Sequence, residues 1–381
     1  MALAMAQDKP PTESDPASAP ATASAPADEA YGLLAEIERR RGPTFPGKDP
    51  AFLVLPRPAE RTDMRELLTD EVRAMTDKAL ACLARSQNAD GSFSDKDFPA
   101  NTGVTALACL AFMAEGSRPR MGRYGKQIDR GLEFLLKNVE DSGIIAGKGS
   151  NPYGPMYEHV FSMLALLQAC GDMPWRPQTR EVLGKGIQAI LRSQKLDGGW
   201  RYLASSEGRS DLSVTANVLW VLRLAKKSGF SVPARAVDRG VKFVSQCAMP
   251  DGTFRYVAAG LHASPSLGGC GIIALCNNGS LDHELIAPAR DRLAYEYRRY
   301  TVDDLKGRRY FAYGCFYASV AMYMCGDTYF QPWFRKAVRV LAAVQRKDGE
   351  IPDESGNTIY TTAMAAMVLQ APYGYLPVYE R

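Results

Sequence analysis

The chain has 381 residues, of which 46% are hydrophobic, and a formal net charge of +4. This length fits one large domain or two ordinary ones, and the small charge, spread along the chain, does not indicate a nucleic-acid partner. No apolar run is long enough to span a bilayer. The eight cysteines are scattered and form no C-x-x-C pair, which favours buried thiols over a disulfide or zinc framework.

Residues 1–60 are predicted to be a disordered segment that precedes the folded domain. Residues 8–30 are rich in Pro, Ala, Ser and Thr, a composition that cannot bury enough apolar surface to fold. The first residues lack the basic region and the long apolar run of a working signal peptide. Ala4-Met5-Ala6 nevertheless resembles the cleavage end of one, which slightly favours a periplasmic or exported protein.

From Thr62-Asp63 onward the sequence predicts an all-α domain over residues 61–381, in which outer and inner helices alternate. The outer helices carry the charge, as in 180–192 and 335–345, whereas the inner helices are apolar on every side, as buried helices are. The inner helices are expected to begin near Thr102, Tyr157, Asp211, Gly268, Tyr310 and Thr358. Six such starts predict six helical hairpins, enough to close a ring of twelve helices.

A repeated turn marks the ends of outer helices. It reads Gln-Lys-Leu-Asp-Gly-Gly-Trp over 194–200, recurs over 87–93, and keeps its first half over 345–349 and a stretched form over 246–254. The Gln amide can bond backbone groups freed at a helix end, and glycine supplies the positive φ needed to leave a helix. The turn glycines are spaced by one or two multiples of roughly 50 residues, which is typical of a repeat architecture. These glycines are Gly91, Gly198, Gly252 and Gly349.

This Q-x-x-D-G-x-W/F pattern resembles the repeat of squalene–hopene cyclases and protein prenyltransferase β-subunits, over about Leu67 to Arg381. Paired helices form an α/α toroid in that superfamily, so the resemblance implies the same fold here. It implies no particular chemistry, because function depends on the site and not on the fold.

The chemical signatures of the superfamily are absent from the chain. In place of the Asp-x-Asp-Asp of class II cyclases stands Thr301-Val-Asp-Asp304, which a helix cap would explain. The Asp-Asp-x-x-Asp of class I synthases and the Asp-x-Cys of zinc prenyltransferases do not occur, and Cys270-Gly-Ile-Ile273 replaces the Cys-Gly-Glu-Gln of thioester domains. We therefore expect neither a metal nor a cofactor. The sequence is most similar to squalene-cyclase-like repeat proteins of unassigned activity.

Glu158, His159 and Asp211 are the candidate catalytic residues. In a toroid the ends of the inner helices line the central cavity, and these three form the only acid–base cluster that two neighbouring inner helices could bring together. Asp211 precedes Ser213 and could equally be a helix cap. His159 could equally be a hydrogen-bonded core residue. The catalytic interpretation requires that the three groups be buried together with shifted pKa values.

Aromatic residues at the same helix ends are the candidate substrate-binding residues. Tyr310, Tyr313, Phe316 and Tyr317 recur at helical spacing, and Tyr157 and Tyr360 lie at two other inner-helix starts. An aromatic face can stabilise a carbocation, but it can also be ordinary core packing in which each hydroxyl finds a partner.

Three classes of function stay open. The first is a terpene-cyclase-like enzyme acting on an apolar isoprenoid in the central cavity. The second is a non-enzymatic lipid-binding or protein-docking scaffold, and the third is a carbohydrate-active α/α-barrel enzyme with paired carboxylates. An apolar cavity above roughly 300 Å³ would favour the first two, and an open polar cleft with an aromatic floor the third. The expected partner is an apolar small molecule. Contact of the protein with a membrane surface is compatible with such a partner. The sequence does not predict the oligomeric state.

Deletion of residues 1–45 tests the predicted N-terminal segment. Because disordered residues contribute no buried area, the melting temperature should stay within about 2 °C of the full chain. Circular dichroism measures this change, and limited proteolysis should cut first within the segment. Protection of these residues from hydrogen exchange would contradict the prediction.

Overall fold

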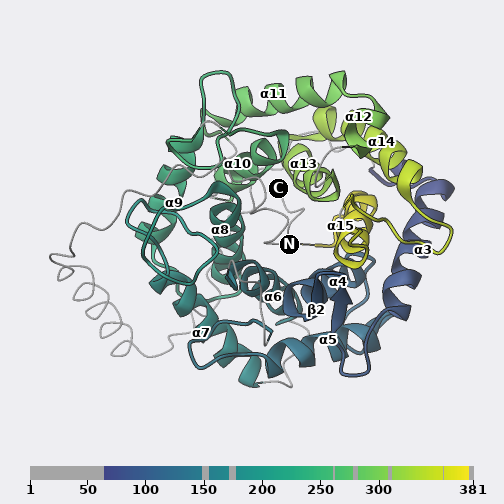
Figure 1. Cartoon of the computed structure of the whole chain (residues 1–381), viewed down its shortest axis with the longest axis horizontal. Coiled ribbons are helices and arrows are strands. Elements are labelled where there is room, and N and C mark those ends of the chain that lie inside the picture. The colour runs from purple at the N-terminus through teal and green to yellow at the C-terminus, as the bar shows by residue number, and fades with distance from the viewer. Residues whose placement is uncertain are drawn as a thin grey trace. The chain divides into compact units, whose positions relative to one another are not determined.

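Six apolar helices form a closed inner ring in this computed structural model, and six more helices surround them (Figure 1). The structure describes residues 64–147, 154–170, 177–260, 262–277, 282–307, 311–354 and 356–376. The predicted N-terminal segment 1–60 lies outside these residues, as do Thr62-Asp63 and the candidate Tyr310.

The inner helices are α4 (Thr102–Ala114), α6 (Met156–Ala169), α8 (Leu212–Lys227), α10 (Pro265–Cys276), α13 (Phe311–Cys325) and α15 (Ile359–Leu369). The outer helices are α3 (Asp70–Arg85), α5 (Gly125–Lys137), α7 (Pro177–Arg192), α9 (Ala234–Cys247), α11 (Ile286–Arg299) and α14 (Asp327–Val344). Each inner helix contacts the next, and α15 contacts α4, so the ring is closed. The short α12 (Val302–Lys306) packs on α14. The predicted all-α toroid of six hairpins is confirmed.

Composition decides which helix lies inside. Every residue of α4 and of α15 is buried, and nearly every residue of α6, because these helices have no polar stripe to present to water. The outer helix α5 instead buries one stripe, with Ile128, Leu132 and Leu135 at helical spacing. Inner and outer positions therefore follow from the sequence alone.

Three local features differ from the sequence prediction. The first outer helix begins only at Asp70, because the Thr69 side chain accepts a hydrogen bond from Val72 N and caps it there; a 3-10 helix, η1 (Met64–Leu67), precedes it. The inner helix α10 begins at Pro265, three residues before the predicted start. An antiparallel hairpin of β1 (Phe93–Asp95) and β2 (Phe98–Asn101) was not predicted.

At three of its copies the repeated turn joins an outer helix to the next outer helix through its glutamine. Gln194 Nε2 donates to Gly198 O (2.7 Å) in its own turn and to Ala236 O (2.8 Å) on α9. Gln87 does the same with Gly91 and with Gln127 of α5. Gln345 Nε2 donates to Met75 O (2.9 Å) on α3. The last repeat turn therefore bonds to the first outer helix.

The turn glycine lies directly against the backbone of that neighbouring helix. Gly198 has φ +98°, and a Cβ there would lie 2.5 Å from Arg239 O on α9. Gly349 has φ +99°, and its Cβ would lie 2.1 Å from Lys78 O on α3. A shorter copy of the turn follows α5 and reads Asp141-Ser142-Gly143. It keeps this contact, because a Cβ at Gly143 would lie 2.6 Å from Lys185 O on α7. Only glycine satisfies both the positive φ and the close approach.

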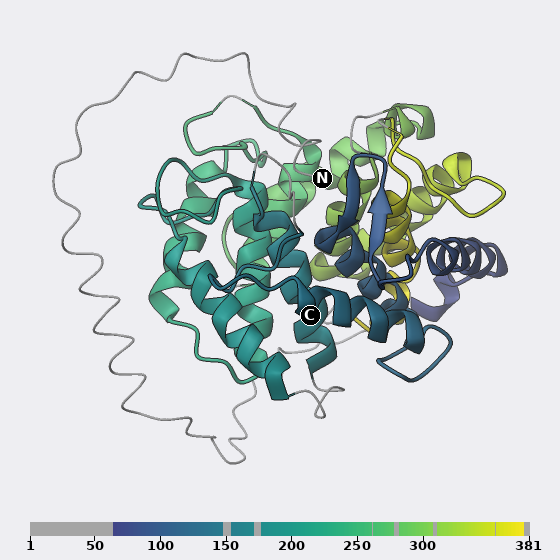
Figure 2. The same ribbon diagram turned by 60° about the horizontal axis from the view of Figure 1, so that its bottom comes forward.

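A second link between the last and first units lies at the N-terminal ends of the inner helices. Asp95 at the end of β1 accepts hydrogen bonds from Thr358 N (2.8 Å), Ile359 N (2.7 Å) and Tyr360 N (2.9 Å). A carboxylate is favourable there, because it satisfies orphan amides and meets the positive end of the α15 dipole. Figure 2 shows the hairpin beside α15.

The C-terminal segment packs on the last two inner helices. The 3-10 helix η3 (Ala371–Tyr373) contacts α13 and α15, and Leu376 beyond it is buried. Among the described residues, no helix combines the length and the hydropathy that crossing a membrane requires.

Trp200→Ala tests the repeat turn. Trp200 is fully buried, its Nε1 donates to Ile190 O (2.8 Å) on α7, and its ring lies 3.0 Å from the position that a Cβ would take at Gly240 on α9. Deleting an aromatic side chain wedged between two outer helices should lower the free energy of unfolding by about 3–5 kcal/mol, measured by denaturant titration.

Leu196→Ala in the same turn is the matched control, because that side chain is 90% exposed. Its effect should stay within about 0.5 kcal/mol. A loss below roughly 1 kcal/mol at Trp200 would show that the aromatic position does not hold the outer helices together.

Candidate functional site

Asp211 is a buried carboxylate with one oxygen in use and one free. It is the N-cap of α8, where Oδ1 accepts from Val214 N (2.9 Å) and from Ser213 Oγ (2.7 Å). The residue is fully buried, and Oδ2 has no hydrogen-bond partner among the described residues. Burial raises its pKa from 3.8 to about 6, because desolvation penalises the charged form more than the two hydrogen bonds favour it.

The cap position recurs in other units with a different residue. Asn101 caps α4 through Val104 N, and Ser264 caps α10 through Leu267 N. An uncharged side chain is therefore sufficient at this position, and α6 and α15 have no side-chain cap at all. Asp211 can therefore be both a helix cap and a candidate acid. Its Oδ1 caps α8, while Oδ2 has no hydrogen-bond partner among the described residues.

Three tyrosines surround this carboxylate. The rings of Tyr157 on α6 and Tyr202 lie 5.9 Å apart, and the hydroxyl of Tyr202 is hydrogen-bonded to that of Tyr256. Burial raises the pKa values of Tyr157 and Tyr256, and the nearby Asp211 charge raises them further. Tyr157 and Tyr256 therefore stay neutral near pH 7.

Two more tyrosines come from α13. Tyr317 OH donates to Asn217 Oδ1 (2.7 Å) on α8, and Tyr313 OH lies 3.6 Å from Cys270 Sγ on α10. The Tyr313 and Tyr317 rings are 4.3 Å apart between centroids. The structure thus gathers aromatic side chains from α6, from α13 and from two repeat turns in the ring interior, close to the N-terminal end of α8.

Towards the other end the ring interior is apolar and almost filled. Phe316 lies 6.3 Å from Trp220 between ring centroids. These two rings line a cavity of only about 20 Å³, and the rest of its lining includes Leu110, Phe161, Met367 and Leu376. This cavity is far smaller than the roughly 300 Å³ that a bound isoprenoid needs.

Glu158 turns away from Asp211 towards α4. Its Oε2 accepts from Thr102 Oγ1 (2.7 Å) and Gly147 N (3.1 Å), while Oε1 is buried and has no hydrogen-bond partner among the described residues. It is the second buried carboxylate of the site with a free oxygen.

His159 turns outward and connects α6 to α7. Its Nδ1 accepts from Ile145 N (3.1 Å), so Nε2 carries the proton and donates to Gly186 O (3.2 Å). Full burial lowers its pKa from 6.5 to about 4, and the ring is neutral near pH 7. With both nitrogens engaged, no ring atom is left for a ligand in this arrangement. No hydrogen bond among the described residues joins Glu158, His159 and Asp211 to one another.

Tyr360 also faces another part of the ring. Its hydroxyl donates to Asp353 Oδ2 and its ring meets Phe98 edge-on, with 6.3 Å between centroids. The structure therefore places Tyr157, Tyr313, Phe316 and Tyr317 in the ring interior, whereas Tyr360 packs between the last turn and β2.

The sequence analysis missed Tyr202 and Tyr256, although a signal was present. Each follows the aromatic position of a repeat turn by two residues, as Trp200-Arg-Tyr202 and Phe254-Arg-Tyr256. Backbone bonds then fix both loops: Tyr202 O accepts from Met156 N, and Tyr256 O accepts from Leu212 N. Aligning the repeat copies beyond the aromatic position would have identified the pair.

The remaining motif tests have plain outcomes. Thr301 and Asp304 form a capping box at α12, with Thr301 Oγ1 accepting from Asp304 N (3.0 Å), so the string nearest to Asp-x-Asp-Asp is a helix start. The part of the chain that the structure describes contains no cluster of three His, Cys, Asp or Glu residues able to hold a metal ion.

These features define an α/α-toroid protein with a buried carboxylate among tyrosines. Comparison with protein-family models and with curated proteins found no match. Solved structures with this fold include a GH76A α-1,6-mannanase from a Salegentibacter species, at 11% identity and TM-score 0.59 over 80% of this chain and 100% of that one.

A type II terpene cyclase from Scytonema is similar at 13% identity and TM-score 0.56, over 82% of this chain and all of that one. An α-amylase from Clostridium perfringens is similar at 11% identity and TM-score 0.57, over 79% and 97%. At such identities the likeness shows the fold alone. The likeness therefore agrees with the toroid fold inferred from the repeat, and it does not single out the terpene-cyclase branch.

The pKa values of Asp211 and His159 predict opposite effects of pH on stability. The folded pKa of Asp211 is raised to about 6, so between about pH 4 and 6 the folded state binds more protons, and stability falls as the pH rises. The folded pKa of His159 is lowered to about 4, so stability rises as the pH goes from 4 to 6.5. In the wild-type protein the two effects oppose each other.

Asp211→Asn removes the first effect and keeps the second. Relative to wild type, its free energy of unfolding should increase by about 3 kcal/mol between roughly pH 4 and 6, since one pKa unit corresponds to about 1.36 kcal/mol. Denaturant titrations of both proteins across this range measure the difference. Parallel stability curves would show that the pKa of Asp211 is not raised.

Proposed function

We propose that this chain is an α/α-toroid enzyme that binds an apolar isoprenoid at the N-terminal ends of its inner helices and protonates it with Asp211. The observation that carries the proposal is the free Oδ2 of a fully buried carboxyl group whose pKa lies near 6. Such a group still holds its proton in part near neutral pH, which is what a general acid requires.

The surrounding side chains suit the charge that such a reaction creates. Transfer of the Asp211 proton to one carbon of a C=C bond leaves a positive charge on the other carbon. The faces of Tyr157, Tyr313 and Phe316 can stabilise that charge through their negative π systems. The cation would then close on a neighbouring double bond, and it ends by losing a proton or adding water. The Asp211 carboxylate regains its proton from solvent.

Binding requires the ring interior to open, because the cavity on the axis measures only about 20 Å³. Leu376 is the one lining residue that comes from the C-terminal segment and not from an inner helix. Its withdrawal would enlarge the cavity without disturbing the ring contacts. An isoprenoid partner would come from a membrane, so contact with a membrane surface and an exported location remain parts of this proposal.

A carbohydrate-active enzyme is the second candidate. Two observations favour it: Glu158 and Asp211 each keep a buried oxygen without a partner in the described part of the chain, and a glycosidase needs two carboxyl groups. The toroid neighbours also include a mannanase and an amylase by name. Against it, Glu158 is directed to α4, away from Asp211.

The test of the first candidate is turnover by Asp211→Asn. Organic extraction of the purified protein and mass spectrometry should reveal a bound isoprenoid, and incubation with squalene and prenyl diphosphates should give a product of changed retention time. Because Asn caps a helix about as well as Asp but cannot give up a proton, the variant should lose turnover by about 100-fold or more without any loss of stability near pH 7.

Ser264→Asn is the matched control, since it changes the equivalent cap of α10 and touches no acid. It should keep full turnover. Full activity in Asp211→Asn would remove Asp211 as the acid. Turnover of α-linked oligosaccharides in place of isoprenoids, lost in both Asp211→Asn and Glu158→Gln, would establish the second candidate instead.

A further inference from the structure

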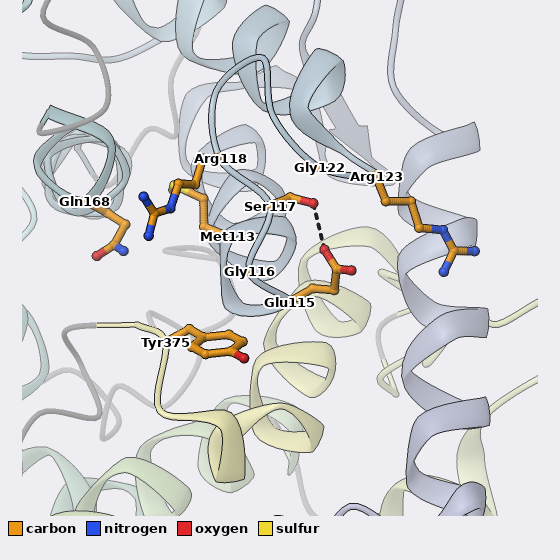
Figure 3. Close-up of a pocket in the computed structure, with 9 residues that line it drawn as sticks. All are labelled: Met113, Glu115, Gly116, Ser117, Arg118, Gly122, Arg123, Gln168 and Tyr375. Carbon is orange, nitrogen blue, oxygen red and sulfur yellow. Dashed lines mark hydrogen bonds between the residues drawn. The ribbon is translucent and has the colours of Figure 1, made fainter.

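A second pocket lies at the opposite end of the ring from Asp211. It follows the C-terminal ends of α4 and α6 and is closed by the C-terminal segment (Figure 3). Its volume is about 530 Å³, within the range of small-molecule sites. The principal lining side chains are Met113, Glu115, Ser117, Arg118, Gln168 and Tyr375.

The aromatic ring of Tyr375 forms one side of this pocket and packs against a second tyrosine. Tyr375 stacks on Tyr373 with 5.4 Å between centroids and planes 7° apart, and Arg73 donates to Tyr373 OH (3.2 Å). Tyr375 nevertheless remains 52% exposed. Gly116 on the neighbouring turn has φ +101°, and a Cβ there would lie 3.3 Å from the Tyr375 ring. A rigid, half-exposed ring of this kind presents a flat face for stacking.

The walls carry planar hydrogen-bonding groups. Gln168 Oε1 is inaccessible to solvent and has no hydrogen-bond partner among the described residues. In Figure 3 the Arg118 guanidinium points across the pocket towards Gln168. Ser117 Oγ donates to Glu115 Oε2 (2.7 Å) and so fixes that carboxylate at the edge. A buried acceptor without a donor is unfavourable until a ligand supplies one.

The charges of the pocket balance. Arg123 at its edge is ion-paired with Asp77 on α3 (2.7 Å), so its charge is compensated outside the pocket. Arg118 and Glu115, which also line the pocket, contribute one cation and one anion. This balance disfavours a phosphate or another strong anion, which would face the Glu115 carboxylate. It favours a neutral ligand that both donates and accepts hydrogen bonds.

We infer that this pocket binds a neutral sugar ring, with its C–H face on Tyr375 and its hydroxyls bonded to Arg118, Glu115 and Gln168. Adjacent hydroxyl groups can accept from the fork of a guanidinium and donate to a carboxylate or an amide oxygen. The stacking contact needs a ligand that is flat and apolar on one face, which a pyranose provides. The site is separate from Asp211, because inner-helix N-termini and C-termini lie at opposite ends of the ring.

Saturation-transfer NMR on the full chain tests this inference. The probes are glucose, galactose, mannose, N-acetylglucosamine and their common disaccharides, each titrated to about 50 mM, where a site with a millimolar Kd is mostly occupied. At least one should bind saturably. Tyr375→Ala and Gln168→Leu should each weaken that binding about fivefold or more. Tyr295→Ala should not, because this tyrosine is similarly exposed (49%) on α11.

Asp211→Asn separates this site from the one proposed for catalysis. Sugar binding should be unchanged in that variant, whether or not it turns over an isoprenoid. Loss of sugar binding in Asp211→Asn would place the sugar at the other end of the ring and overturn the inference. Three further results would also overturn it: no saturable sugar binding, binding unaffected by Tyr375→Ala, and tighter binding of inorganic phosphate that Arg118→Ala abolishes.

Discussion

The ring depends on one side-chain amide that bonds in two directions. A glutamine at the end of an outer helix donates one hydrogen to its own turn and the other to a carbonyl in the first half of the next outer helix, as Gln194 does with Gly198 and Ala236. The amide hydrogens are fixed in one plane, so the two bonds set the direction of the next helix relative to the turn. Gln87 repeats this geometry between α3 and α5, and Gln345 repeats it between α14 and the first outer helix, where the ring closes.

Closure of the ring explains why the inner helices tolerate so little polarity. Each inner helix has neighbours on two sides and an outer helix behind it, so its whole surface is withdrawn from water. Polar groups are retained there where the backbone needs them. Thr105 Oγ1 accepts from Phe93 N (2.8 Å), and Thr215 Oγ1 accepts in the same way from Trp200 N (2.9 Å). These threonines join the inner helix to the aromatic position of the turn.

Asp211 differs from these structural polar groups, because an uncharged side chain would cap its helix equally well. Asn101 and Ser264 cap their helices without any charge, whereas Asp211 adds a carboxylate to the interior and leaves Oδ2 unpaired. An unpaired buried acceptor is unfavourable for folding, and such groups are concentrated at functional sites. The pocket at the opposite end of the ring differs in its chemistry, because it combines charges of both signs with the exposed aromatic ring of Tyr375. The two ends of the toroid therefore offer two chemically distinct surfaces.

The sequence by itself determined the architecture, because each element of the repeat acts locally. The spacing of the turn glycines, the apolar inner helices and the charged outer ones predicted the twelve-helix ring, and inner-helix starts such as Thr102 and Tyr157 fall within one residue of the structure. Asp211 was identified as both a cap and a candidate acid from the residues that follow it.

Only the tertiary structure decided which side chains meet. Glu158, His159 and Asp211 are close in the helical pattern, yet each turns to a different neighbour, since successive residues of a helix point about 100° apart. Tyr202 and Tyr256 come from two loops whose meeting depends on the packing of adjacent units. The unpaired state of Oδ2, the pKa it causes and the polar pocket at Tyr375 are likewise properties of surroundings built from distant parts of the chain. Local sequence encodes helices and turns, whereas desolvation depends on every atom that approaches a group in the folded ring.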